Sequence, residues 1–149
     1  MRAVVQRVAE ASVAVDGAEI ARIGRGLVVL VGFARGDTAA HAGWMARKVA
    51  SLRIFEDETG RMSLALDAVG GEMLVVSQFT LYGDVRKGAR PGFDRSAPPE
   101  EARALYERFV EFVRAATPVR VVTGEFQAHM RVSLVNDGPV TIQIEKSEP

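Results

Sequence analysis

The feature that most restricts the fold is a continuous apolar run from Leu27 to Phe33, with the sequence LVVLVGF. The run is rich in β-branched residues, and it is far shorter than the roughly 20 apolar residues that span a bilayer. A run of this kind is typical of a strand covered on both faces. A second run, Met73 to Phe79, follows Gly70-Gly71. We therefore expect a strand at each run, the first of them central in a sheet.

Two segments have the periodicity of amphipathic helices. The first begins at Asp37 or Thr38, either of which can cap a helix, and continues to about Leu52. The second is announced by the sequence PPEE at 98–101, because proline and acidic residues favour the first helical turn. Its apolar face recurs at helical spacing through Ala102, Leu105, Tyr106, Phe109 and Val113.

Shorter alternating segments predict the remaining strands, and Asp16-Gly17 predicts a hairpin turn between two of them. The predicted fold class is α+β: a mixed or antiparallel sheet or half-barrel of about seven to eight strands with two main helices. No linker or repeat divides the chain, so one domain is expected over residues 1–149. The shorter strands are expected at Val4–Val8, Ser12–Val15, Ala18–Ile23, Ile54–Phe55, Val119–Val122, Met130–Val135 and Val140–Ile144.

Composition excludes several classes of function. The sequence contains no cysteine, which rules out disulfides, thiolate nucleophiles and cysteine-ligated zinc. Nineteen basic residues balance nineteen acidic ones, so any contact with nucleic acid has to come from a local basic surface. Met1 leads directly into a strand-like alternation without a signal-peptide pattern, and no stretch is long enough to cross a membrane. A cytoplasmic location is expected.

Side chains that usually carry catalysis are scarce. The sequence has no GxSxG elbow, HExxH motif, Walker loop or GxGxxG motif. Of the two histidines, His41 is expected to be solvated on the first helix, and His129 to lie at the surface or a rim. Asp84 and Asp94 are expected to pair with neighbouring arginines rather than to exchange protons. No ligand cluster for a metal is visible, and no cofactor is expected.

Two segments stand out against this background. Ser77-Gln78-Phe79-Thr80 places hydroxyls, an amide and an aromatic ring where an apolar strand ends, which is a common place for ligands. The plainer reading is that Ser77 and Thr80 end the strand and that Phe79 is core. Asn136-Asp137-Gly138-Pro139 is a turn signal between two strands, and the sequence does not reveal the isomer of its X-Pro bond.

A basic loop follows the first of these segments. Residues 86–95 carry Arg86, Lys87, Arg90 and Arg95, and Phe93 lies among them. Cations interleaved with aromatic rings favour contact with a nucleic-acid backbone. The acids of the same stretch reduce its charge, and a solvated loop is the more frequent outcome.

The segments Ser77–Thr80 and Asn136–Pro139, taken together, resemble the signature motifs of the D-aminoacyl-tRNA deacylase family. The resemblance runs nearly from end to end, through MRAVVQRV, SLRIFED, GGEMLVVSQFTLYGD, RKGARPGF and SLVNDGPVT. It implies that Ser77, Gln78 and Phe79 lie beside the terminal adenosine and its aminoacyl ester, with Thr80 as a candidate nucleophile. It also implies that Gly138-Pro139 is a cis-proline element reaching into the site of a dimer partner. By the same resemblance, Arg7 holds that element, and Phe126 and Met130 line the pocket.

The resemblance further implies an activity and its partners. The family hydrolyses the ester of D-aminoacyl-tRNA, and glycyl-tRNA is an expected secondary substrate because glycine is achiral. Backbone carbonyls of Gly138 and Pro139 would capture the substrate's α-ammonium group and so exclude an L side chain. Neither Thr80 nor Ser77 has a base close in sequence, so we favour assistance by the ribose 2′-hydroxyl of the tRNA. A homodimer with two shared sites is implied, with no membrane or DNA partner.

The sequence departs from the family pattern at a few positions, and it is also compatible with several alternative functions. Gln127, His129 and Arg131 differ from the residues that the family pattern leads us to expect, and Gly92 replaces a common serine. The main alternative is a noncatalytic nucleic-acid-binding module that uses the basic loop. A small-molecule esterase, a peptidase for D-residues and a purely structural homodimer are the others.

Overall fold

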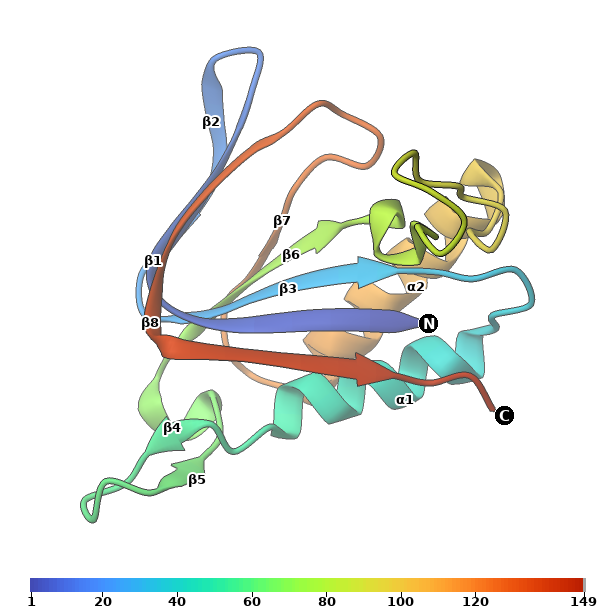
Figure 1. Ribbon diagram of the computed structural model, residues 1–149. Helices are drawn as coiled ribbons and strands as arrows, with labels where there is room; N and C mark the ends of the chain where they lie inside the picture. Colours follow the sequence, from blue (N-terminus) through green and yellow to red (C-terminus); the bar gives the residue numbers. More distant parts are fainter. Residues whose placement is uncertain (149) are drawn as a thin grey trace.

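A computed structural model describes residues 1–148. One curved sheet carries the architecture, with strands in the order β2-β1-β3-β6-β7 and with β8 paired to the free side of β1 (Figure 1). Pairs that include β1 are antiparallel, whereas β3, β6 and β7 are parallel to one another. The strands are β1 (Arg2–Val15), β2 (Ala18–Ile23), β3 (Gly26–Gly32), β6 (Glu72–Ser77), β7 (Val121–Thr123) and β8 (Arg131–Glu145).

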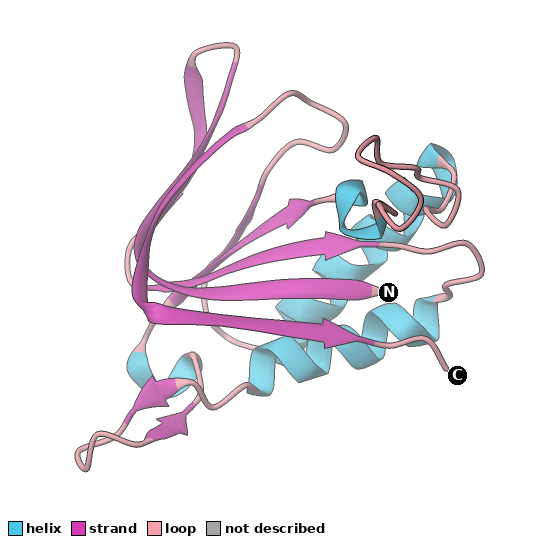
Figure 2. Ribbon diagram, in the orientation of Figure 1, coloured by secondary structure: helices cyan, strands magenta, loops and turns pink. Residues whose placement is uncertain are grey.

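Two helices, α1 (Ala39–Ser51) and α2 (Pro99–Ala116), pack against each other and cover one face of the sheet (Figure 2). A small separate sheet of β4 (Phe55–Glu56) and β5 (Met62–Leu64) projects from one end of the molecule, and the short helix η1 (Asp67–Val69) follows it. The predicted α+β half-barrel with two main helices is confirmed. Among the described residues, no helix has the length and apolar character needed to cross a membrane.

The two faces of β3 are buried in different clusters, as its unbroken apolar sequence predicts. Leu27, Val29 and Val31 face α1 and α2 in the larger core. Val28 packs on the opposite face, with the ends of β1 and β2 that curl towards β6. Because side chains alternate along a strand, a strand enclosed on both faces has to be apolar at every position.

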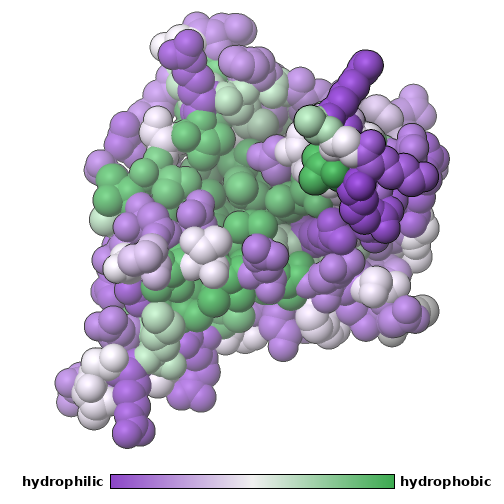
Figure 3. Space-filling model, viewed as in Figure 1, coloured by the Kyte–Doolittle hydropathy of each residue, from purple (hydrophilic) through white to green (hydrophobic). Residues whose placement is uncertain are grey.

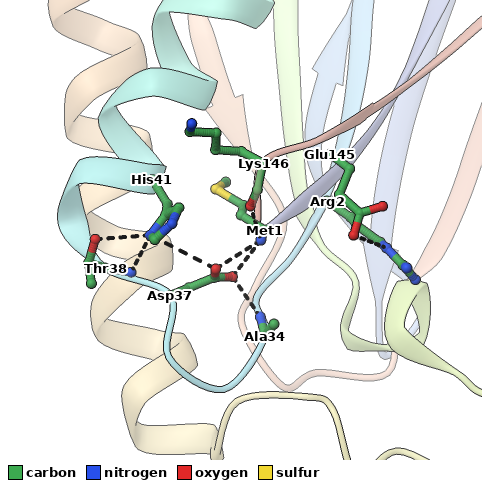
Figure 4. A network of polar contacts seen from close by, with 8 residues as sticks. All are labelled: Met1, Arg2, Ala34, Asp37, Thr38, His41, Glu145 and Lys146. Carbon is green, nitrogen blue, oxygen red and sulfur yellow. Dashed lines mark hydrogen bonds and ion pairs between the residues drawn. The ribbon is translucent and has the colours of Figure 1, made fainter. Parts of the chain in front are cut away.

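Hydrogen bonds tie the first strand and the last to the loop before α1 (Figure 4). The Met1 ammonium donates to Asp37 Oδ1 at 2.9 Å and to the Lys146 carbonyl at 2.8 Å. His41 lies beside this network and is only 7% exposed, so the prediction of a solvated histidine is wrong. Its Nδ1 accepts the Thr38 backbone N–H at 2.9 Å, closing the first turn of α1 and turning the ring inward.

The strand boundaries differ from the sequence prediction at two places that matter for the site. β6 ends at Ser77, and Phe79 begins a short 3₁₀ helix, η2 (Phe79–Tyr82), rather than ending a strand. The two strands expected at 130–135 and 140–144 are one strand, β8, whose register against β1 shifts on either side of Val8. The segment 137–139 is therefore an interruption within a strand and not a hairpin loop.

Candidate functional site

An open pocket of about 690 Å³ lies where the parallel strands β3 and β6 end. Strand ends followed by long connections commonly hold ligands, because the loops that follow can converge there. Four separate stretches of chain supply the walls, within residues 31–35, 76–79, 93–102 and 126–132. The lining residues are Val31, Gly32, Phe33, Arg35, Val76, Ser77, Gln78, Phe79, Phe93, Ser96, Ala97, Pro98, Pro99, Ala102, Phe126, Gln127, Ala128, His129, Met130 and Val132.

Close backbone packing between β3 and the end of β6 places Ser77 and Gln78 in this pocket. The ladder pairs Val31 with Ser77, and the Gln78 N–H donates to the Val31 carbonyl at 2.7 Å. A Cβ on Gly32 would lie only 2.7 Å from the Gln78 carbonyl, so a glycine is required there. Both predicted site residues are half-buried and line the pocket.

Phe79 is exposed at the mouth of the pocket and is not a core residue. The residue is 59% exposed, and its ring meets that of Phe93 edge to face, with ring centroids 5.1 Å apart. Ser96 Oγ donates to the Phe79 carbonyl at 3.3 Å, which ties the turn to the segment after the basic loop. The plainer reading of Phe79 as core is therefore wrong, because the chain leaves the strand two residues earlier and turns the ring outward.

Thr80 is exposed and does not line the pocket. Its Oγ1 accepts a short hydrogen bond from Gln78 Nε2. Among the described residues, the Thr80 hydroxyl forms no hydrogen bond with a histidine, lysine or carboxylate. An activated hydroxyl nucleophile needs a base within hydrogen-bond reach, so the observed arrangement does not favour that chemistry.

The opposite wall is the turn between β7 and β8, which contains Phe126 and Met130. Phe126 packs beside Tyr106, with ring centroids 5.7 Å apart, and the Arg103 guanidinium lies 4.7 Å from the centre of the Phe126 ring. Gln127 adopts φ 65°, in the left-handed region, and its Oε1 accepts from Arg103 Nη2 at 3.1 Å. Gln127 and His129, which stood out as departures in the sequence, thus line the pocket, and His129 is exposed at its rim as predicted.

Two titratable groups close to the pocket walls have clearly shifted pKa values, and neither of them lines the pocket. Burial raises the pKa of Tyr106 to about 12, and its hydroxyl donates to the Val75 carbonyl at 3.1 Å. The Arg86 side chain holds the pKa of Asp84 well below its usual range, as expected for a paired carboxylate. No cluster of three or more potential metal ligands occurs within the described part of the chain.

Arg7 and the segment 137–139 form a second polar arrangement outside this pocket. Arg7 is only 7% exposed; its Nε donates to the Asp137 carbonyl at 2.9 Å and its Nη1 to the Ile54 carbonyl at 2.8 Å. Gly138 and Pro139 are exposed, joined by a cis peptide bond, and absent from the pocket lining. The sequence-predicted site residues therefore fall into two groups that one chain does not bring together.

Asn136 bridges the strand interruption, a role that sequence reasoning did not find. Its Nδ2 donates to the carbonyls of Arg7 and Val140 at 3.2 and 3.0 Å, and its Oδ1 accepts from the Val140 N–H at 3.2 Å. The amide thus replaces backbone partners that the shift in register removes. Asparagine before a turn is so common that its presence alone did not signal this role.

Comparisons with known proteins find matches that cover nearly the whole chain. The family described as D-Tyr-tRNA(Tyr) deacylase matches residues 4–145. A protein of Thermotoga petrophila named "D-aminoacyl-tRNA deacylase" is 56% identical over 148 residues, 99% of each chain. One of that name from Thermomicrobium roseum is 59% identical over 148 residues, covering 99% of this chain and 96% of the relative.

Two solved structures have the same fold. A structure titled "c-Myc DNA Unwinding Element Binding Protein" superposes with a TM-score of 0.94 at 45% identity, covering 99% of this chain and 100% of that one. A structure titled as a probable eukaryotic D-amino acid tRNA deacylase has a TM-score of 0.84 at 22% identity, covering 96% and 97%. The second likeness concerns the fold alone.

Proposed function

This chain belongs to the D-Tyr-tRNA(Tyr) deacylase family and is a hydrolase, and from that premise we propose that it releases D-amino acids from the 3′-terminal adenosine of tRNA. The observation that carries the proposal is the pocket at the end of β6. There Ser77, Gln78 and Phe79 offer a hydroxyl, an amide and an exposed ring beside an apolar wall. Such a set suits an adenosine bearing a small ester-linked group. We place the reaction in the cytoplasm, without a metal or cofactor.

An ester is already an activated acyl group, so hydrolysis requires little from side chains. Binding the ester in one orientation and donating hydrogen bonds to the developing oxyanion would lower the barrier. The ribose 2′-hydroxyl of the substrate lies next to the ester and would assist the attacking water. Thr80 is not given the role of nucleophile, because its contact is with the Gln78 amide and not with a base.

Selection of the D configuration is assigned to the carbonyls of Gly138 and Pro139. If they accept hydrogen bonds from the α-ammonium group while the pocket holds the ester, the α-carbon has two of its substituents fixed. An L side chain would then be driven into backbone, whereas a D side chain would point outward. Glycine would also be accepted, so glycyl-tRNA is the expected secondary substrate.

A second copy of the chain is the proposed source of those carbonyls. Gly138 and Pro139 are exposed and do not line the pocket of their own chain. Val132, which does line it, and Val135 leave apolar surface exposed on β8, and Figure 3 shows a broad apolar area over the face of the sheet that the helices leave uncovered. Exposed apolar area of this kind marks interaction sites. We propose a twofold homodimer in which each pocket receives the 137–139 segment of the partner.

The test compares release of amino acid from matched D-tyrosyl-, L-tyrosyl- and glycyl-tRNA. The wild-type protein should release the D and glycyl forms and leave the L form intact. Gly138→Ala should abolish release, because a Cβ there would meet the Val140 backbone nitrogen and lie 2.7 Å from Val140 Cγ2. The matched control is Gly60→Ala, at a glycine with a positive φ of 80° and open space around it.

Three outcomes would contradict the proposal. Equal release of D and L amino acids would remove the chiral role. Binding of tRNA without any release would favour a noncatalytic nucleic-acid-binding module. Release from simple D-amino acid esters as fast as from tRNA would favour a small-molecule esterase.

A further inference from the structure

The basic loop contains a closed hairpin, and two of the cationic side chains in this hairpin have no partner within the chain. Asp84 and Gly92 exchange backbone hydrogen bonds at 2.8 and 2.9 Å, which closes the chain between them; we call residues 84–92 the basic hairpin. Within it, Arg86 is occupied by Asp84, with Nη2 and Oδ2 2.6 Å apart. Lys87 and Arg90 are exposed and form no ion pair or hydrogen bond within residues 1–148. Two of the three cations are therefore available to a ligand.

The basic hairpin is held at the mouth of the pocket by bonds at both of its ends. It follows η2 directly, and the Gly83 N–H donates to the Thr80 carbonyl at 2.9 Å. On the other side Arg35 Nε, from a residue that lines the pocket, donates to the Asp94 carbonyl at 2.9 Å. The Ala97 N–H donates to the carbonyl of Phe33 at 2.9 Å. The hairpin therefore has a defined position relative to the exposed ring of Phe79.

The positive charge near the pocket is a local feature of the basic hairpin and not a property of the whole chain. The chain as a whole is neutral, with nineteen residues of each sign, so no global field attracts a polyanion. Figure 1 shows the segment around 83–97 projecting at the open end of the sheet, and Figure 3 shows a strongly hydrophilic cluster there, beside the apolar area. An anion extending out of the pocket past Phe79 would meet this cluster first.

We propose that Lys87 and Arg90 bind phosphates of the single-stranded nucleotides that precede the esterified adenosine. The inference rests on the proposed function, because it takes the adenosine to lie beside Phe79. A single strand that leaves the pocket past Phe79 and Phe93 would carry its phosphates towards the neighbouring hairpin that bears the two unpaired cations. Arginine binds phosphate through paired N–H donors and lysine as a point charge, so this pair provides affinity without reading sequence.

The first test needs no catalysis. Binding of uncharged tRNA is measured across a series of salt concentrations for the wild type and for Lys87→Ala/Arg90→Ala. For single strands, the slope of log K against log salt is about −0.7 per neutralised phosphate, so the double variant should have a slope shallower by about 1.4. The matched control is Arg47→Ala/Arg61→Ala, which removes two exposed arginines on α1 and on the β4–β5 hairpin. Its slope should equal that of the wild type.

The second test separates this inference from the proposed function. The double variant should lose about tenfold or more in kcat/KM with D-tyrosyl-tRNA, mainly through KM. With the D-tyrosyl ester of adenosine, which has no phosphate, it should match the wild type within twofold. That result would also show that the pocket is folded. Equal losses on both substrates, or an unchanged salt slope in tRNA binding, would overturn the assignment. If the wild type hydrolyses neither substrate, the proposed function fails, and the binding slope still decides the role of the two cations.

Discussion

Replacing Asn136 with aspartate would test whether a side-chain amide holds the 137–139 segment. The two side chains have the same shape, so packing does not change. The aspartate keeps an acceptor for the Val140 N–H, but it replaces the Nδ2 donor with an oxygen facing the carbonyls of Arg7 and Val140, at 3.2 and 3.0 Å. Two hydrogen bonds become two repulsive contacts.

The expected loss of stability follows from those contacts. Each neutral hydrogen bond contributes about 1 kcal/mol net, and a buried group left without a partner costs about 1–3 kcal/mol. Asn136 is half-buried, so we expect Asn136→Asp to lower the free energy of unfolding by about 2–4 kcal/mol at neutral pH. Asn136→Ala removes all three bonds, including the one accepted from the Val140 N–H, but adds no opposing oxygen, so its loss of stability should be of similar size. D-selective deacylation should fall with both variants.

Urea unfolding followed by fluorescence would measure the loss. Trp44 is the only tryptophan and lies near the cations of Lys48 and Lys146, so its emission reports on α1 and on the chain after β8. All samples are compared at one protomer concentration, since the proposed dimer would unfold in a concentration-dependent way. Gln143→Glu makes the same chemical change at an exposed site on β8 and should alter stability by less than about 0.5 kcal/mol. If Asn136→Asp is no less stable than this control, the amide does not hold the segment.

Three further substitutions test other parts of the site. Arg7→Lys should lower the free energy of unfolding, measured in urea, by about 1.5–3 kcal/mol, because one ammonium cannot reach both carbonyls that the guanidinium reaches. It should also reduce turnover of D-tyrosyl-tRNA, and wild-type stability and turnover would contradict this role. Gln127→Gly should raise the free energy of unfolding by up to about 1 kcal/mol, since φ 65° suits glycine and the hydrogen bond lost to Arg103 is exposed. A clearly lower free energy of unfolding in urea would show that this hydrogen bond outweighs the backbone strain. With its pKa raised to about 12, Tyr106 keeps its proton in the folded state above pH 10 while the unfolded chain loses it, so stability falls as pH rises from 10 to 12. Tyr106→Phe should make that fall shallower in unfolding measured against pH, and an unchanged slope would mean that Tyr106 does not titrate in this window.

The architecture was predictable where burial alone determines the residues. β3 is apolar at every position because helices cover one of its faces and the curled sheet the other, and the same signal identified β6. Helix α2 was predictable because its apolar residues recur at helical spacing on one face. His41 was not, because its burial depends on Asp37 and Thr38 in the loop before α1, a contact that helical periodicity does not report.

The site was predictable only in its parts. The chemistry of Ser77 and Gln78 is visible in the sequence, but the walls around them come from loops far apart in the chain. Phe79 illustrates the limit, because its apolar character favours core burial and only the end of β6 at Ser77 turns it outward. The interruption at 137–139 looked like a hairpin, because a turn sequence does not reveal that both of its flanks pair with the same strand, β1.

The most direct test of the account mixes two inactive variants and measures release from D- and L-tyrosyl-tRNA. Gln78→Ala damages the pocket, and Gly138→Ala damages the segment proposed to enter the partner's pocket. After unfolding together and refolding, half of the dimers should be mixed, and each of these has one intact composite site. We expect about a quarter of wild-type activity on the D substrate and none on the L substrate. No recovery from two folded, dimeric variants, or recovery that includes the L substrate, would contradict it.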